Sequence, residues 1–138
     1  MFHHTKREGL VPSLLNRNAM KRLIPLFVLI MAGCTASNRF ESVDATRFGE
    51  VIKHPEVQLV DVRTADEYNS GHIVGAENMD VNQSDFDSRV ATLDKHRPVA
   101  LYCRSGRRSK IAAERVATHG FTVIELDGGI LSWHGEVE

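Results

Sequence analysis

The chain has 138 residues, enough for one compact domain and too few for two domains of ordinary size. Its 17 Lys and Arg residues nearly balance its 18 Asp and Glu residues, so the formal net charge is -1. A charge this small excludes the overall positive field that draws a protein to nucleic acid. With 42% hydrophobic and 25% charged residues, the composition is that of an ordinary globular domain and points to no particular chemistry.

Residues 1–33 have the pattern of an export signal. Lys21 and Arg22 precede an apolar run of ten residues, 23–32, which ends in small residues. Ten helical residues span roughly 15 Å, about half of the hydrocarbon core of a bilayer, so the run is too short for a stable membrane span. A buried first helix of the fold is the alternative interpretation. Met20 begins a segment of normal signal length, so we expect translation to start there and residues 1–19 to be superfluous.

The end of this signal resembles the lipobox of bacterial lipoproteins. Met31-Ala32-Gly33-Cys34 has the small residues and the cysteine of that motif. The resemblance implies that Cys34 is acylated and becomes the new N-terminus, with residues 34–41 as a lipid-anchored tether. We therefore expect a protein held on the bacterial cell envelope and facing the periplasm. Thr35 stands where Asp would retain a lipoprotein in the inner membrane, which favours the outer membrane.

Predicted strands and helices alternate along the rest of the chain. Residues 57–62 are apolar and rich in Val, as is typical of a buried parallel strand. Thr64 and Glu67 form a capping box that predicts the start of a short helix, and Gly71 is placed to end that helix. The spacing predicts further helices over residues 44–53, 84–93 (capped by Ser84) and 108–118, strands over 98–103 and 121–126, and a last short helix after Gly128-Gly129. This alternation predicts a small α/β domain over residues 42–138, with a mainly parallel sheet flanked by helices.

Cys103 ends the strand predicted at residues 98–103, where ligands bind in parallel sheets. Residues 104–108 then turn into a helix, so several backbone N–H groups can point inward and bind an anion. Gly106 permits a backbone conformation or a close approach that a Cβ would hinder.

Three arginines, Arg104, Arg107 and Arg108, lie within five residues of Cys103. Helix N-termini and neighbouring cationic groups lower the pKa of a cysteine thiol. The pattern therefore predicts a Cys103 thiolate at the mouth of the loop, next to a site for a small dianion. The alternative is an inert strand-end cysteine followed by a solvated helix start. With Cys34 assigned to lipid, Cys103 has no disulfide partner, and no Cys-x-x-Cys redox motif is present.

The segment 103–108, Cys-Arg-Ser-Gly-Arg-Arg, resembles the six-residue active-site loop of rhodanese domains. Two further groups of motifs agree with that family in the expected order. They are Asp61-Val62-Arg63, Glu67-Tyr68, Gly71-His72-Ile73 and Gly75-Ala76-Glu77-Asn78 before the loop, and Leu126-Asp127-Gly128-Gly129 and Ser132-Trp133 after it. The match covers residues 42–138 and implies a rhodanese-like fold.

The resemblance also implies a sulfurtransferase without a cofactor. Cys103 would take a sulfur from thiosulfate or a similar small donor, hold it as a persulfide, and pass it to a thiol or to cyanide. Arg104, Ser105, Gly106, Arg107 and Arg108 would bind the substrate, with the N–H groups of the loop stabilising the anionic sulfur. Arg104 in the second loop position is similar to the thiosulfate-using members and unlike the mercaptopyruvate-using ones, which tend to have Gly there.

The other motif residues are interpreted as structural. Asp61 and Arg63 are expected to form an ion-pair network with Glu67. His72 is expected to pack near the loop through a hydrogen bond, and Trp133 to lie in the core. The remaining histidines, His54, His96, His119 and His134, lack the spacing of metal ligands, so no metal is expected.

Two alternative functions use the same fold. A phosphatase or arsenate reductase needs a Cys-x5-Arg loop, but the position of that arginine is occupied by Ser109. A persulfide carrier or binding module that serves a protein partner retains the cysteine and stays open.

Overall fold

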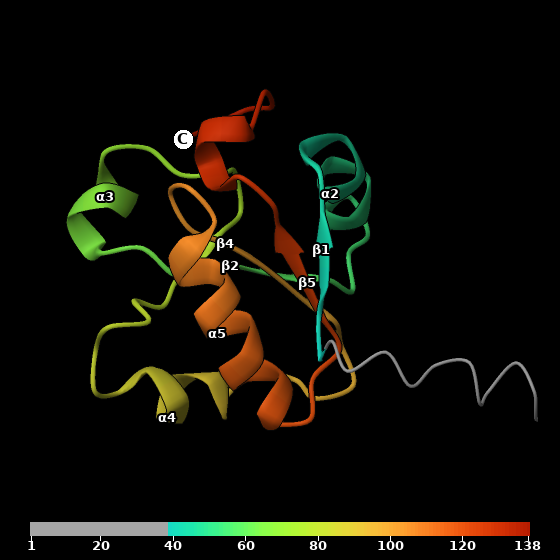
Figure 1. The fold of residues 1–138 in the computed structure, drawn as a ribbon, viewed down its shortest axis with the longest axis vertical. Helices are drawn as coiled ribbons and strands as arrows, with labels where there is room; N and C mark the ends of the chain where they lie inside the picture. Colours follow the sequence, from blue (N-terminus) through green and yellow to red (C-terminus); the bar gives the residue numbers. More distant parts are fainter. Residues whose placement is uncertain (1–38) are drawn as a thin grey trace, which may run out of the picture. The chain divides into compact units, whose positions relative to one another are not determined.

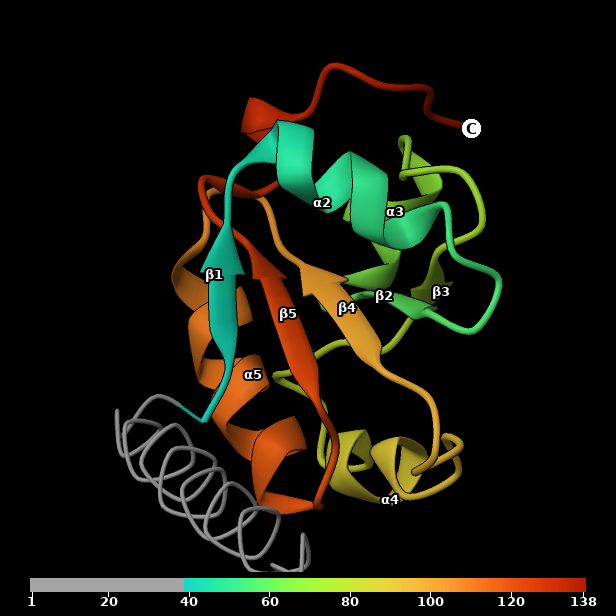
Figure 2. The ribbon, with the colours of Figure 1, turned by 90° about the vertical axis from the view of Figure 1, so that its right-hand side faces the viewer.

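The computed structural model describes residues 39–138, so the predictions for the export signal and for Cys34 lie outside the described residues. Five strands form one sheet in the order β1-β5-β4-β2-β3, and every neighbouring pair is parallel (Figure 2). The strands are β1 (Glu41–Val43), β2 (Gln58–Asp61), β3 (Glu77–Asn78), β4 (Val99–Tyr102) and β5 (Val123–Leu126). The predicted parallel α/β fold is therefore confirmed.

Helices cover both faces of the sheet. Figure 1 shows α2 on one side of the strands and α4 with α5 on the other. The helices are α2 (Ala45–Ile52), α3 (Ala65–Asn69), α4 (Phe86–Val90), α5 (Arg107–Thr118) and the short 3-10 helix η1 (Gly129–Ser132). No helix within residues 39–138 combines the length and apolar character needed to cross a membrane.

The central strand β4 is buried on both faces, which explains why its sequence is a continuous apolar run. Val99 and Leu101 point to the core beneath α4 and α5, whereas Ala100 and Tyr102 point to the core beneath α2. Because side chains alternate along a strand and both faces are covered, all four residues are buried. Cys103 continues the first of these two sets and lies in the α5 core.

The helix starts are explained by short polar contacts. The Asp44 side chain accepts a hydrogen bond from the Arg47 N–H at 2.8 Å and caps α2. Thr64 accepts one from the Glu67 N–H at 3.2 Å, which confirms the predicted capping box. The prediction that Ser84 caps a helix over residues 84–93 is wrong. The Phe86 N–H donates to the Gln83 carbonyl, so this segment is still a turn at Ser84, and α4 has only five residues.

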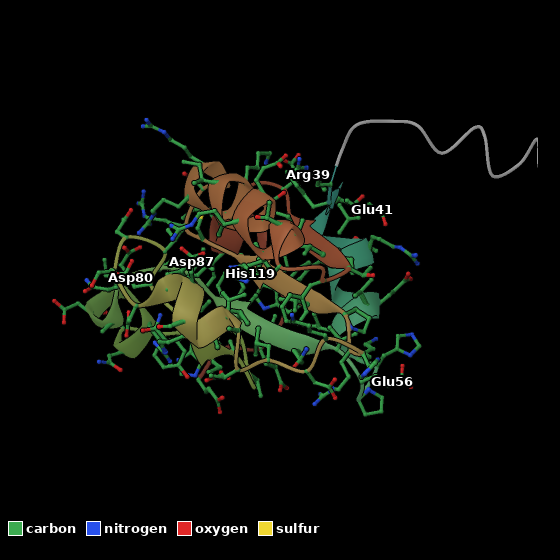
Figure 3. The ribbon with its side chains drawn as sticks, turned by 90° about the horizontal axis from the view of Figure 1, so that it is seen from below. Arg39, Glu41, Glu56, Asp80, Asp87 and His119 are labelled. Atoms are coloured by element: carbon green, nitrogen blue, oxygen red, sulfur yellow. The ribbon has the colours of Figure 1, made fainter. Side chains whose placement is uncertain are left out.

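Charged side chains at the start of α4 and at the end of α5 join the two helices. Arg115 donates to an Asp87 carboxylate oxygen at 2.6 Å, and His119 Nε2 lies 3.2 Å from the other oxygen. Figure 3 labels Asp87 and His119, which lie next to each other in that view. On α5, Ile111 is 54% exposed, because the small residues Ala112 and Ala113 occupy the buried face of that helix.

Two edge strands were not predicted. β1 has the sequence Glu-Ser-Val and pairs with β5 from Glu41, a residue that the sequence assigns to the tether. β3 has only two residues. Both are too short to show a hydrophobic period, and they form only because a longer central strand offers its edge for pairing.

Candidate active site

Cys103 follows β4 at the carboxyl end of the sheet, directly before the turn into α5. Its sulfur accepts a hydrogen bond from the Gly106 N–H at 3.0 Å and lies 3.3 Å from the Ser109 hydroxyl. Gly106 adopts φ +103°, and a Cβ there would lie 3.1 Å from the backbone nitrogen of Gly128. Glycine is required at this position, since the conformation is left-handed and the next turn is in contact.

The thiol is enclosed by the loop. Cys103 has no exposed surface, whereas Arg104 and Ser105 face solvent. This corrects the expectation of a sulfur at the mouth of the loop. A reagent reaches Sγ only where the loop admits it, and the backbone N–H groups already point at the sulfur.

The pKa of Cys103 is lowered from its ordinary value of 9.0. Burial has the largest single effect and raises the pKa. Hydrogen bonds from the Ser109 hydroxyl and from the backbone N–H groups of Ser109, Gly106 and Ser105 together outweigh it. The predicted thiolate is thus favoured by hydroxyl and peptide donors at the start of α5, and not mainly by the three arginines as expected.

The arginines of the loop differ in their surroundings. Arg108 donates to both carboxylate oxygens of Glu67, at 2.7 and 2.9 Å. The side chain of Arg104 is exposed and has no carboxylate partner among residues 39–138. The backbone carbonyl of Arg104 accepts a hydrogen bond from the Leu131 N–H at 3.1 Å. Arg107 is the exposed first residue of α5.

A shallow hollow lies beside the loop. It is lined by Arg63, Glu67, Ser70, Arg104, Arg108, Ile130 and Leu131. Two of the five predicted substrate-binding residues, Arg104 and Arg108, line it. Ser105 and Gly106 face the sulfur through their N–H groups, and Arg107 belongs to neither set.

The predicted network of Asp61 and Arg63 is present with different partners. Arg63 donates to the buried Asp61 carboxylate at 2.6 Å and to the Gly71 carbonyl at 2.7 Å. Glu67 binds Arg108 and not Arg63 in the hydrogen bonds of the described residues. The pair therefore joins the end of β2 to the turn after α3, which is a structural role.

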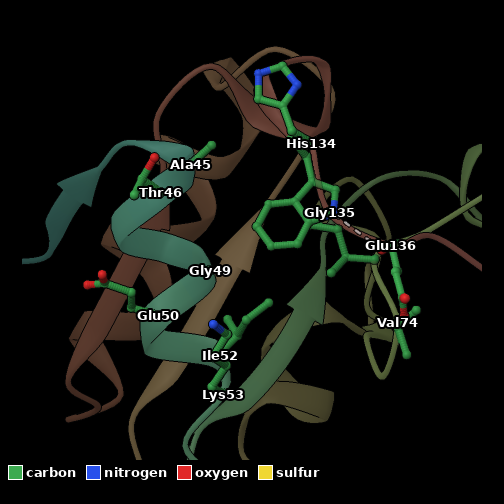
Figure 4. A pocket seen from close by; sticks show the side chains of 12 residues that line it. Ala45, Thr46, Gly49, Glu50, Ile52, Lys53, Val74, His134, Gly135 and Glu136 are labelled. Carbon is green, nitrogen blue, oxygen red and sulfur yellow. Dashed lines mark hydrogen bonds between the residues drawn. The ribbon is translucent and has the colours of Figure 1, made fainter.

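The aromatic contacts of His72 and Trp133 are with residues outside the loop that holds Cys103. The His72 ring stacks on Tyr68 at 3.7 Å, its Nδ1 contacts the Tyr68 carbonyl, and its Nε2 lies 3.4 Å from a Glu138 carboxylate oxygen. The ring therefore contacts α3 and Glu138, and among the described residues it has no hydrogen bond to the loop. Trp133 packs edge-on against Phe48 and also borders an apolar cavity next to α2. Figure 4 shows this cavity, with Gly49 and Ile52 of α2 facing the segment that holds Gly135. Within residues 39–138, no three His, Cys, Asp or Glu side chains are grouped as metal ligands.

Sequence reasoning missed one residue next to the site. Glu125 is a fully buried carboxylate in β5 and accepts a hydrogen bond from Ser109 at 2.5 Å. The sequence does contain an indication of this role, because Glu125 is the only charged residue in the strand Val-Ile-Glu-Leu. In the sequence, Ser109 is marked only as the position where a phosphatase would carry arginine.

The chain is similar to known proteins over nearly all of the described residues. The family model described as "Rhodanese-like domain" matches residues 44–136. "Thiosulfate sulfurtransferase GlpE" of Shewanella oneidensis is 32% identical over 96 residues, which cover 69% of this chain and 93% of that protein. "Putative sulfur carrier protein YrkF" of Bacillus subtilis is 31% identical over 90 residues, covering 64% of this chain and 48% of that protein. The solution structure of the rhodanese-like domain of Alr3790 from Anabaena has a TM-score of 0.63 at 30% identity, covering 70% of this chain and 77% of that chain.

Proposed function

The chain belongs to the rhodanese-like domain family, and from this premise we propose that it is a sulfurtransferase that carries sulfur as a persulfide on Cys103. The observation that carries the proposal is the position of Sγ, which accepts the Gly106 N–H at the start of α5 and contacts the Ser109 hydroxyl. Such donors stabilise an anionic sulfur. The name of the Shewanella relative supports the same reaction.

The reaction has two halves. In the first, the Cys103 thiolate attacks the outer sulfur of thiosulfate, a sulfur–sulfur bond forms to Sγ, and the old bond breaks with its electron pair leaving on sulfite. In the second, a thiolate or cyanide attacks the outer sulfur of the persulfide. The bond to Sγ then breaks, and Cys103 returns as the thiolate. No cofactor takes part.

The donor is best described as a small sulfur-containing dianion. Arg104 and Arg108 line the hollow beside the loop, and the charge of Arg104 has no partner among residues 39–138. Glu67 already neutralises much of the charge of Arg108. Arg104 therefore has the main part in attracting thiosulfate or a similar donor to this side of the sulfur.

The direct experiment is intact mass of the whole chain after thiosulfate and again after cyanide. The expected result is a gain of one sulfur atom that cyanide removes, with thiocyanate in solution. Cys103→Ser is the control and gains nothing. A folded wild-type protein without the mass gain would contradict the proposal for thiosulfate, and an equal gain in Cys103→Ser would contradict the role of Cys103.

The carrier function is the second candidate, and the name of the Bacillus subtilis relative favours it. A carrier holds the same persulfide but delivers it to a protein partner. It would gain the sulfur atom in the mass experiment and turn over slowly with cyanide or small thiols. Steady-state rates with those acceptors therefore separate the two candidates.

We also propose that the protein is anchored by a lipid on Cys34 and faces the periplasm, in the outer membrane of the bacterial envelope. The support is the sequence alone, namely the apolar run 23–32, whose last two residues begin the segment Met31-Ala32-Gly33-Cys34. Several acyl chains on one residue give stable anchoring, whereas one chain gives only marginal binding.

A further inference from the structure

A buried chain of three polar groups leads from the reactive sulfur into the sheet. Cys103 Sγ lies 3.3 Å from the Ser109 hydroxyl, which lies 2.5 Å from the Oε1 atom of Glu125. All three residues have no exposed surface. The chain thus places a carboxylate one hydroxyl away from the sulfur.

The two neighbours of Ser109 compete for one hydrogen atom. A serine hydroxyl has one proton to donate and two lone pairs that accept. When that proton is donated to Glu125, Ser109 can only accept from the Cys103 thiol. When Cys103 is a thiolate, it has no proton to offer, and the Ser109 hydroxyl adds to the backbone N–H donors only if it turns its own proton toward the sulfur.

Glu125 does not depend on Ser109 alone. Its Oε2 atom accepts from the Ser42 hydroxyl at 2.5 Å, and Lys110 Nζ lies 3.4 Å from both carboxylate oxygens. Ser42 and Lys110 therefore keep the carboxylate satisfied when Ser109 turns away. The geometry supports a hydroxyl with two positions, each with its partners in place.

The other charged groups around this chain of polar groups have carboxylate partners besides Glu125. Lys110 is shared with Asp127 at 2.9 Å. Arg108, on the first turn of α5, is held by Glu67, and Arg63 at the end of β2 is held by Asp61. None of them contacts the Ser109 hydroxyl in the hydrogen bonds of the described residues.

Building on the proposed function, we infer that Ser109 is a two-position donor and that Glu125 and Ser42 are positioning residues that decide how readily it serves the sulfur. In the resting thiol, Cys103 donates to Ser109 and Ser109 donates to Glu125. On ionisation the thiol proton leaves to solvent, and the Ser109 hydroxyl rotates from Glu125 to Sγ. The anionic persulfide uses the same second position.

The test is the ultraviolet absorbance of the Cys103 thiolate as a function of pH, taken as the difference from Cys103→Ser. This readout needs no sulfur donor, so its failure is separate from a failure of the proposed function. Ser109→Ala removes a donor to a charged group and should lower the thiolate-to-thiol ratio at neutral pH about tenfold. Glu125→Gln weakens the competitor and should raise that ratio about threefold or more.

The decisive variant is Glu125→Gln combined with Ser109→Ala. If Glu125 acts through the hydroxyl, its substitution loses most of its effect once Ser109 is absent. An equal effect in both backgrounds would overturn the inference, because Glu125 would then act only by its charge.

Ser42→Ala keeps the inference testable if the Glu125 variant does not fold. Loss of the Ser42 hydrogen bond leaves Glu125 more dependent on Ser109, so the thiolate ratio should fall about threefold, although Ser42 does not contact Cys103. The effect should vanish in the Ser109→Ala background. Ser88→Ala is the matched control, since that exposed hydroxyl donates to the Asp85 carbonyl and has no other hydrogen bond within residues 39–138. An unchanged titration in Ser42→Ala would contradict the coupling.

Discussion

Glu67 and Arg108 join α3 to the first turn of α5 through paired hydrogen bonds of 2.7 and 2.9 Å. The two residues are 41 positions apart in the sequence, and each side chain is about three-quarters covered. A bidentate pair of this kind fixes both orientation and distance. The last arginine of the loop is therefore committed to the protein itself, whereas Arg104 is available to a ligand.

The first prediction concerns the acid stability that this pair provides. The Arg108 guanidinium lowers the pKa of Glu67 from 4.5 to about 2. A carboxyl with a lowered pKa stabilises the fold above its ordinary pKa, and this contribution is lost as the pH falls from 4.5 through about 2. We expect Glu67→Gln to cost roughly 1–2 kcal/mol in the free energy of unfolding at neutral pH, after allowance for solvent screening.

Urea unfolding at a series of pH values measures this difference. The wild type and Glu67→Gln should converge in stability toward pH 2. Glu50→Gln, which removes an exposed carboxylate 3.7 Å from Arg47, should change the free energy of unfolding by less than about 0.5 kcal/mol. A constant gap between wild type and Glu67→Gln across the acid range would contradict the prediction.

The second prediction separates the arginines of the loop. Arg104→Ala should raise the KM for thiosulfate about fivefold and make it less sensitive to salt, since an unpaired charge beside the hollow attracts the dianion. Arg107→Ala should change KM by less than about twofold, because Arg107 does not line the hollow. Steady-state kinetics at two ionic strengths give both values, and a larger effect at Arg107 would reverse the assignment.

The third prediction concerns the turn that supports the loop. Gly129 has φ +62°, and a Cβ there would lie only 2.6 Å from the Cys103 carbonyl oxygen, beside the Arg104 carbonyl. Gly129→Ala should therefore cost about 3 kcal/mol or more in the free energy of unfolding. Gly120→Ala is matched, with φ +91° and nothing within 4 Å, and should cost only the backbone strain of about 1–2 kcal/mol. Equal losses in the two variants would show that the close approach is unimportant.

The fourth prediction tests the anchor. Cys34→Ser should move the protein from the membrane fraction to the soluble fraction, because the proposed acyl chains would then have no thiol at residue 34 to attach to. The soluble protein should keep its sulfurtransferase rate, since Cys103 is unchanged. Fractionation with detergent controls measures the first effect, and continued membrane residence of the variant would point to another anchor.

Much of the fold was predictable because its central strands have strong local patterns. The apolar run at β4 and the capping box at Thr64 depend on near neighbours, and both were identified from sequence. The position of Cys103 at the carboxyl end of β4 followed from the same pattern. The edge strand β1 was not predictable, since three residues make a strand only when β5 is beside them.

The electrostatics of the site were less predictable. The clustering of arginines suggested that they activate Cys103, but sequence spacing does not show which charges are neutralised, and Glu67 lies 41 residues from Arg108. Nor does it show that Glu125 and Ser109 meet, because β5 and α5 come together only in the folded sheet. The sequence therefore predicts a reactive cysteine at the end of β4, but it does not predict the hydrogen-bond network that sets the ionisation of that cysteine.

The contact between the Gly106 and Gly128 turns has a consequence for how such a site can diversify. The sulfur is held largely by peptide N–H groups, which every residue except proline possesses. Substitutions at the exposed positions 104 and 105 can therefore alter which donor approaches without removing the groups that stabilise the sulfur. The two glycines keep the backbone in place, so selectivity for the donor and stabilisation of the anion can change independently in this loop.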